Sequence, residues 1–186
     1  VSVLSECDVV YVAPDVPTDD NGKSDLSGIT ELLSIVIPAL KQDSTLVILS
    51  QVSPGFTRNL SRENGPIYYQ VETLIFGKAI ERAMYPERFI IGCFDSSEPL
   101  SALYKQYLEA FNCPVLTMRY ESAELAKISI NMCLVASVSV ANTMAEVCEK
   151  IGADWSEITP SLRLDKRIGQ FSYIEPGLGI SGGNLE

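Results

Sequence analysis

The stretch CDVVYVA, Cys7–Ala13, decides the fold. It is rich in β-branched residues and almost free of polar side chains, which is typical of a strand buried on both faces of a sheet. STLVILS, Ser44–Ser50, has the same pattern, and Ile29–Lys41 between them has apolar residues at helical spacing, with Ser27 as the predicted N-cap. A strand, a helix and a second doubly buried strand predict an α/β fold with a parallel sheet.

Outward from this unit, the sequence predicts more strands and then an all-helical region. Strands are expected at Pro66–Glu72, Glu87–Cys93 and Cys113–Met118, with a helix over Glu98–Phe111. Glu121–Ile151 contains neither proline nor glycine and predicts one long helix, and a last helix is expected over Asp154–Asp165, bent or restarted at Pro160. We therefore expect an α/β domain over residues 1–119 and a helical region over residues 120–186.

Composition argues against several classes of protein. The 186 residues include 24 acidic and 14 basic ones, a formal net charge of −10, whereas a nucleic-acid binder normally has a basic face. Apolar runs such as Ile35–Leu40 are much shorter than a membrane span, and the first residues show no signal-peptide pattern. We expect no nucleic-acid partner and no membrane segment.

The cysteine and histidine content predicts a cytoplasmic protein without a metal site. The chain has five cysteines, none in a CxxC pair, and no histidine. Scattered thiols in odd number predict reduced, mostly buried side chains in a reducing compartment. Without histidine, neither a zinc site nor a Ser-His-Asp triad is expected on this chain. The cysteines are Cys7, Cys93, Cys113, Cys133 and Cys148.

Lys127 and Asn131 are the first candidates for chemistry. They lie four residues apart on the predicted long helix, so they share one helix face, and their neighbours are apolar. A lysine and an amide in such surroundings need partners or a cleft, so the pair fits side chains directed at a ligand oxygen. On spacing alone, a solvated stripe on a long helix is the better interpretation.

Other candidates follow the predicted strands, at the edge where open parallel sheets usually bind ligands. Glu72 ends one strand, and Ser50 and Gln51 end another. Arg167, in LDKRIG, lies near a turn glycine and fits a phosphate or sugar contact, although a surface ion pair explains it as well. The dense glycines of Pro176–Glu186 predict backbone that lies close to a ligand.

Taken together and in order, six stretches resemble one enzyme family. DVVYVAPDVPTDDNGKSDLS, residues 8–27, resembles a strand with a VPTP-type loop and a D-G-x-x-D-L-S continuation. SQVSPGFT, residues 50–57, resembles an STVPPGTT strand end. QVETLIFGKAIERAMYPERFIIG, residues 70–92, resembles the pattern NPEFLxEGxAIxDxxxPDRxxIG.

The other three stretches lie in the helical region. SAELAKISIN, residues 122–131, resembles AExxKxxxN at the start of a long helix. LDKRIG, residues 164–169, resembles an acidic-D-x-RIG segment, and PGLGISGGNLE, residues 176–186, resembles PGxGFGGSCxxKD. By resemblance over nearly its whole length, the chain is identified as a member of the UDP-glucose/GDP-mannose 6-dehydrogenase family. These enzymes oxidise the C6 alcohol of a nucleotide sugar to a carboxylate with two NAD.

The resemblance implies an architecture, a cofactor and a substrate. Residues 1–119 would be the back part of a Rossmann-like NAD-binding domain, and residues 120–186 part of a central region whose long helix forms a homodimer core. The family's GxGYxG loop would precede Val1, and its nucleotide-sugar-binding domain would follow Glu186. The implied cofactor is NAD, and the implied substrate is a nucleotide sugar.

The resemblance also implies roles for individual residues. Lys127 and Asn131 match the pair that contacts the C6 oxygen of the sugar and stabilises the developing alkoxide and the later oxyanion. Glu72 matches a glutamate that helps to activate water, and Arg167 matches an arginine that reaches the substrate of a neighbouring subunit. Further substrate contacts are implied at Leu74, Gly177, Gly179, Gly182 and Gly183. Cofactor contacts are implied at Pro17, Thr18, Ser50 and Gln51.

Three departures from the family pattern bear on the chemistry. The family's nucleophilic cysteine is replaced by Asn184, or by Leu185 if the position is counted from the last glycine pair. Gln51 replaces a threonine, and Phe76 replaces a second glutamate. Without the thiol, no thiohemiacetal forms from which hydride leaves to give a thioester. We expect the oxidation of alcohol to aldehyde to survive and the second oxidation to be slow.

Two other interpretations stay open. The combined departures fit a family member that has lost catalysis and binds a nucleotide sugar, or a catalytic partner, as a regulatory or assembly subunit. The pair Lys127 and Asn131 also fits the 6-phosphogluconate and hydroxyacid dehydrogenases. YPERFIIG and LDKRIG favour the nucleotide-sugar branch.

Overall fold

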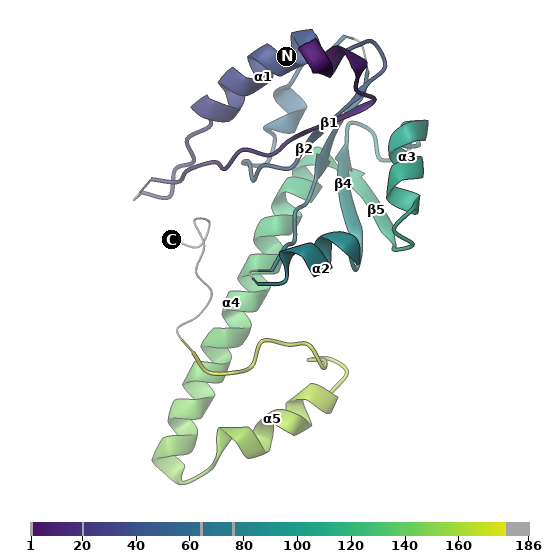
Figure 1. Ribbon diagram of the computed structural model, residues 1–186. Coiled ribbons are helices and arrows are strands. Elements are labelled where there is room, and N and C mark those ends of the chain that lie inside the picture. The colour runs from purple at the N-terminus through teal and green to yellow at the C-terminus, as the bar shows by residue number, and fades with distance from the viewer. Residues whose placement is uncertain (1, 20, 64, 76, 178–186) are drawn as a thin grey trace. The chain divides into compact units, whose positions relative to one another are not determined.

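Figure 1 shows the computed structural model, which describes residues 2–19, 21–63, 65–75 and 77–177. The chain divides into two compact units, Val1–Lys127 and Ile128–Glu186. The predicted domain boundary after residue 119 stays a prediction. The two units are described in turn, each by itself.

A five-stranded sheet with helices forms the first unit. Its strands lie in the order β1-β2-β3-β4-β5. A 3₁₀ turn at Ser2–Glu6 precedes β1, and a second at Thr57–Asn59 precedes β3. The strands are β1 (Val9–Val12), β2 (Thr45–Ile48), β3 (Ile67–Gln70), β4 (Phe89–Cys93) and β5 (Val115–Arg119). The helices are α1 (Ser27–Ala39), α2 (Ala79–Met84), α3 (Ala102–Glu109) and the start of α4 (Tyr120–Ile151).

The α/β prediction is confirmed, but the sheet is mixed rather than wholly parallel. Strands β1, β2 and β3 pair in parallel, β3 and β4 pair antiparallel, and β4 and β5 are again parallel. A parallel connection needs a crossover that returns along the sheet. Between Gln70 and Phe89 the described residues form only α2, a helix of six residues, so β4 starts at the edge where β3 ends.

Local predictions at two helix ends need correction. Ser27 is not the N-cap of α1 but its first residue, and its main-chain N–H donates to Oδ1 of Asp25. Pro160 does not restart the helix, because α5 (Trp155–Leu164) runs through it without a break, and the predicted bend at Pro160 stays a prediction. Asp154 caps α5 by accepting the main-chain N–H of Ser156.

The cysteine prediction is wrong in part. All five thiols are free, but only Cys93 and Cys148 are buried. Cys7 and Cys113 are partly exposed and Cys133 is exposed. Cys133 and Cys148 both lie in α4, and Cys7 and Cys113 lie in loops before β1 and β5, where side chains are usually less covered than in a strand such as β4, which holds Cys93.

The three parallel strands bring the predicted cofactor and catalytic positions to one edge. Because β1, β2 and β3 point the same way, their carboxyl ends meet at the same edge of the sheet. The loops that follow these strands carry Pro17 and Thr18, then Ser50 and Gln51, and then Glu72. Strand topology therefore places these five residues at a common edge.

One face of the sheet packs against α3. Tyr104 and Leu108 of α3 are fully buried against Val47 and Tyr68, and the rings of Tyr68 and Tyr104 stack with centroids 5.1 Å apart. Side chains alternate between the faces of a strand, so Tyr69 points to the opposite face, where α4 begins. A Cβ at Gly92 would lie 2.9 Å from Cβ of Ala123 in α4. Only a glycine lets β4 and α4 approach this closely.

The first turns of α4 are held to the sheet and its loops by polar contacts. Glu124 is completely buried, and its carboxylate accepts the main-chain N–H groups of Gly55 and Thr57 at 2.5 and 2.9 Å. The hydroxyl of Tyr120 donates to the carbonyl of Ile67 at 2.7 Å. A hydrogen bond to a charged group such as the Glu124 carboxylate contributes about 1.5–3 kcal/mol, more than a bond between neutral groups such as that of Tyr120. The two bonds of Glu124 are therefore the strongest of these contacts.

An arginine clamp reinforces the start of α4. Arg58 forms a two-pronged ion pair with Glu121, with N–O distances of 2.8 and 3.1 Å. Its guanidinium also lies over the rings of Phe94 and Tyr120, 4.8 and 5.1 Å from their centroids. This pairing lowers the pKa of Glu121 to about 2.

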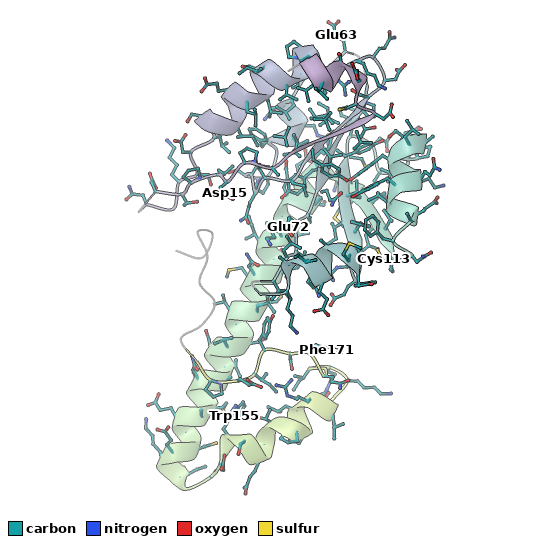
Figure 2. All side chains as sticks on the ribbon, viewed as in Figure 1. Asp15, Glu63, Glu72, Cys113, Trp155 and Phe171 are labelled. Carbon is teal, nitrogen blue, oxygen red and sulfur yellow. The ribbon has the colours of Figure 1, made fainter. Side chains whose placement is uncertain are left out.

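The rest of α4 from Ile128, then α5 and a loop to Gly177 make up the described part of the second unit. Trp155, which is labelled in Figure 2, donates its indole N–H to the carbonyl of Ile174 at 2.9 Å, and Ile174 is buried. Arg163 donates to the carbonyl of Gln170 and pairs with Glu175. These bonds fold the loop back onto α5.

By length and apolar composition, α4 would be able to cross a membrane. The sequence prediction missed this because single polar residues interrupt its apolar runs. One such helix is weak support for a membrane segment, since core helices of soluble proteins pass the same test. The expectation of no membrane segment therefore stays a prediction.

Substitution of Gly92 by alanine is expected to destabilise the protein by about 1–3 kcal/mol, because the added Cβ overpacks the contact between β4 and α4. The free energy of unfolding from urea denaturation measures the effect. Gly28→Ala is the matched control, since a Cβ there meets no atom within 4 Å and α1 should gain slightly. Equal stability of the two variants would contradict the close approach.

Glu121→Gln is expected to lower the free energy of unfolding at neutral pH but not at pH 2. Glu121 has a folded pKa of about 2, below its ordinary value of 4.5, so its ionised form stabilises the fold above pH 4.5. That stability is lost as the pH falls towards 2. The difference between wild type and variant should therefore shrink over this window in urea denaturation, and a difference that stays constant would exclude the ion pair as its source.

Candidate functional site

Lys127 and Glu72 meet at the carboxyl edge of the sheet. The ammonium Nζ of Lys127 donates to the main-chain carbonyl of Glu72 at 2.7 Å, and both residues are half-buried. The carboxylate of Glu72 accepts the main-chain N–H of Leu74 at 2.5 Å. The structure thus brings together two residues that are 55 positions apart in the chain and that the sequence predicts to share a site.

This geometry holds the lysine without neutralising it. A carbonyl oxygen accepts one of the three ammonium protons, and the charge stays available to a ligand oxygen. Lys127 lies one helical turn after Glu124, so the buried carboxylate that fixes α4 also fixes the start of the lysine side chain. Asn131 follows one turn later in the same helix and is partly buried.

The predicted cofactor positions differ in how free they are. The hydroxyl of Ser50 is buried and donates to the carbonyl of Pro14 at 2.6 Å. Thr18 and Ser24 form an isolated antiparallel β-bridge, and the main-chain carbonyl of Pro17 accepts the N–H of Asp25. The two ends of this loop are therefore hydrogen-bonded to each other. The hydroxyl of Ser50 and these main-chain groups of the loop thus already have hydrogen-bond partners within the protein.

Gln51 is the exception at this edge. Its side-chain oxygen Oε1 is buried, and among the described residues it has no hydrogen-bond partner. An unpaired buried acceptor costs about 1–3 kcal/mol, so the position favours a ligand that donates a hydrogen bond. The hydroxyl and amide groups of a dinucleotide are such donors, and the residues present therefore fit NAD at this edge.

Arg167 lies at the surface of the second unit. Its side chain is 89% exposed and grips the carboxylate of Asp165 with two bonds of 3.0 and 2.7 Å. The guanidinium lowers the pKa of Asp165 below its usual value. Within one chain Arg167 therefore forms the surface ion pair that the sequence also allowed, and its reach to a second subunit stays a prediction.

Asn142 holds the start of the glycine loop. Its amide donates to the carbonyl of Gly177 at 2.9 Å and accepts the N–H of the same residue at 2.8 Å. Both groups of one side chain thus attach Gly177 to α4. The predicted positions Phe76, Gly179, Gly182, Gly183, Asn184 and Leu185 lie outside the described residues.

Sequence reasoning missed Glu124 and Asn142. Both carried a signal, because each is a polar residue within a largely apolar stretch of α4 and needs a partner if buried. Their partners are main-chain groups of distant loops, which spacing along a helix does not reveal. Within the described ranges, no group of three or more cysteine, aspartate or glutamate side chains is placed to hold a metal ion.

Comparison with known proteins matches both parts of the chain to one family. Residues 2–108 match the model of the UDP-glucose/GDP-mannose dehydrogenase family, NAD binding domain, and residues 121–186 match the central domain of the same family. The cofactor prediction is thus confirmed at the level of the family. The domain match also covers the predicted cofactor loops.

Individual relatives agree with this match. UDP-glucose 6-dehydrogenase TuaD of Bacillus subtilis is 28% identical over 190 residues, which cover 97% of this chain and 41% of TuaD. UDP-glucose 6-dehydrogenase of Rickettsia bellii is 30% identical over 187 residues, covering 96% of this chain and 43% of the relative. The chain thus spans less than half the length of these curated relatives.

A solved structure shows the same fold. The UDP-glucose dehydrogenase from the hyperthermophilic archaeon Pyrobaculum islandicum superimposes with a TM-score of 0.83 at 27% identity, covering 97% of this chain and 44% of that one. The Rossmann-like fold class is therefore confirmed. The chain belongs to the UDP-glucose/GDP-mannose dehydrogenase family.

Proposed function

We propose that the protein to which this chain belongs oxidises the C6 hydroxyl of a nucleotide sugar, of the UDP-glucose or GDP-mannose type, with NAD. The observation that carries the proposal is the contact between Lys127 and Glu72 at the carboxyl edge of the sheet. It holds the ammonium of Lys127 against the main-chain carbonyl of Glu72, at the edge where open α/β sheets bind ligands. Family membership supplies the substrate class.

Lys127 would act on the oxygen of the reacting alcohol. NAD, when bound near Ser50 and Gln51, supplies the hydride acceptor. The ammonium of Lys127 and the amide of Asn131 would donate hydrogen bonds to the C6 oxygen, which becomes negative as its proton leaves. Since Lys127 is already fixed by the Glu72 carbonyl, little reorganisation is needed when this charge develops.

The first oxidation needs only these groups. Transfer of one hydride from C6 to NAD and release of one proton from its oxygen to water would convert the alcohol to an aldehyde. The second oxidation needs a tetrahedral adduct that can lose hydride, and a thiol forms such an adduct readily. By the resemblance, Asn184, or Leu185 if the position is counted from the last glycine pair, stands at the family's cysteine position, and neither a carboxamide nor a leucine side chain is a nucleophile of this kind. We therefore propose that the aldehyde, or its hydrate, is the main product.

A binding subunit without turnover is the second candidate. It is favoured by the combined departures at Gln51, Phe76 and Asn184 from the family pattern. In that case Lys127 and Asn131 would still contact the sugar oxygen. Nucleotide-sugar binding without formation of NADH would distinguish this function from the first.

We further propose that α4 pairs with a second copy of the chain, as the resemblance implies. Apolar side chains along the helix are exposed, among them Met132, Val140 and Ile151 at 59%, 59% and 72%. A partner would bury them, and this assembly accounts for an apolar helix without a membrane. The free thiols fit a reducing compartment, so we place the protein in the cytoplasm.

The protein is expected to form about one NADH for each nucleotide sugar consumed, because only the first oxidation is fast. Absorbance at the NADH band, with UDP-glucose and GDP-mannose at limiting concentration, gives this ratio. The variant Asn184→Cys should raise the ratio towards two by restoring a thiol. Asn184→Ser is the matched control, since its hydroxyl is a much weaker nucleophile and should leave the ratio near one.

Two outcomes would contradict the proposal. A ratio of two in the wild type would show that the second oxidation does not need the missing thiol. No NADH with either sugar, together with binding of the sugar in calorimetry, would establish the binding subunit instead.

A further inference from the structure

We propose that a pocket beside Glu72 binds a small planar carboxylic acid. The pocket has a volume of about 260 Å³ and lies in the first unit, where β3 ends between α2 and the end of α3. Glu72 and Leu74 contribute to its lining, whereas Lys127, Ser50 and Gln51 do not. The pocket therefore adjoins the predicted sugar site at Glu72 and Leu74 but does not include the space around Lys127.

Two arginines give the pocket its preference for an acid. Arg82 and Arg88 both line it, and both contact the single carboxylate of Glu87, at 2.5 and 3.2 Å. Their side chains are mostly buried, at 19% and 32% exposure, so both guanidinium groups are poorly hydrated. Since the two positive charges share the one carboxylate of Glu87, one positive charge is left without a counter-charge. The remaining N–H groups of the two forks suit bidentate binding of a carboxylate.

The charge balance of this pocket differs from the family pattern. In the pattern quoted above, aspartate stands where this chain has Arg82. The replacement turns a negative group into a positive one beside Arg88. Glu72 is the other charged residue of the lining, and its carboxylate accepts the main-chain N–H of Leu74 rather than an arginine.

Aromatic side chains give the pocket its preference for a flat ring. Tyr107, of α3, is 46% exposed and lies 6.2 Å from Tyr11 and 5.4 Å from Phe111 between ring centroids. All three line the pocket. An exposed tyrosine with aromatic neighbours offers a surface on which a planar ring can stack.

Gln70 adds a donor. The hydroxyls of Tyr11 and Tyr104 both donate to its side-chain oxygen, at 3.3 and 2.7 Å. Burial raises the pKa of both phenols, so they remain protonated donors. This orients the amide and leaves its NH₂ group without a protein acceptor among the described residues. A ring carbonyl would accept from it, so the ligand class is a planar ring with one carboxylate and a carbonyl.

Orotate has these features and serves as the probe. Calorimetry at low salt, without cofactor or sugar, compares orotate with uracil, which lacks the carboxylate, and with acetate, which lacks the ring. Orotate is expected to bind at least tenfold more tightly than either. Equal or weaker binding of orotate would overturn the proposal, whatever the outcome of the dehydrogenase assay.

Variants test the residues. The double variant Arg82→Gln and Arg88→Gln should weaken orotate binding at least tenfold, while Lys105→Gln, an exposed cation on α3 outside the pocket, should change it less than twofold. If circular dichroism shows that the double variant is unfolded, Tyr107→Ala replaces it and should weaken binding at least threefold. Binding that is unchanged in a folded variant would contradict the assigned pocket.

Discussion

The buried carboxylate of Glu124 is the contact on which the arrangement of the first unit depends. It joins α4 to the loop after β2 through two main-chain N–H groups, and it has no access to solvent. A buried acceptor with two donors in place is stabilising, whereas the same carboxylate without them would be costly. The position of the loop at Gly55–Thr57 and the position of the start of α4 therefore depend on each other.

The candidate site depends on this tie. Glu124 binds main-chain N–H groups a few residues after Gln51, in the loop that follows β2. Lys127 lies one turn after Glu124 in the same helix. Lys127 in turn reaches the Glu72 carbonyl in the loop after β3. Three segments that are distant in sequence thus meet at one edge because one side chain fixes the helix there. The glycine at position 92 permits the close approach that brings the helix within reach.

Sequence alone predicted the elements well and their connections less well. Buried β-branched runs predicted β1 and β2, shorter apolar runs predicted β3, β4 and β5, and the absence of proline and glycine predicted α4, because these patterns reflect local packing. The antiparallel direction of β4 relative to β3 follows from the short connection through α2. No comparable sequence pattern predicts that direction. Lys127 and Glu72 were predictable as partners only by resemblance. Glu124, Asn142 and the arginine pair at Glu87 emerged from contacts between segments, which no spacing rule encodes.

The departures from the family pattern act on different parts of the chemistry. Under the proposed function, Asn184 would affect the step that needs a nucleophile, and Gln51 would offer a buried acceptor to the cofactor. Arg82 places a positive charge in the lining of the pocket beside Glu72. None of them lies in the framework of Glu124, Gly92 and Tyr120 that holds α4. The family fold is therefore kept, while the departures fall at positions that are predicted or proposed to contact ligands.

Amide hydrogen exchange at Gly55 and Thr57 tests the central claim most directly. In the variant Glu124→Gln, one acceptor oxygen becomes an NH₂ donor, so at least one of the two amides loses its partner. Because a bond to a charged group contributes about 1.5–3 kcal/mol, that amide should exchange about 10–100 times faster than in the wild type. Glu146→Gln, at an exposed site on the same helix, should leave both rates unchanged. Unchanged exchange at Gly55 and Thr57 in Glu124→Gln would show that this carboxylate does not hold the loop.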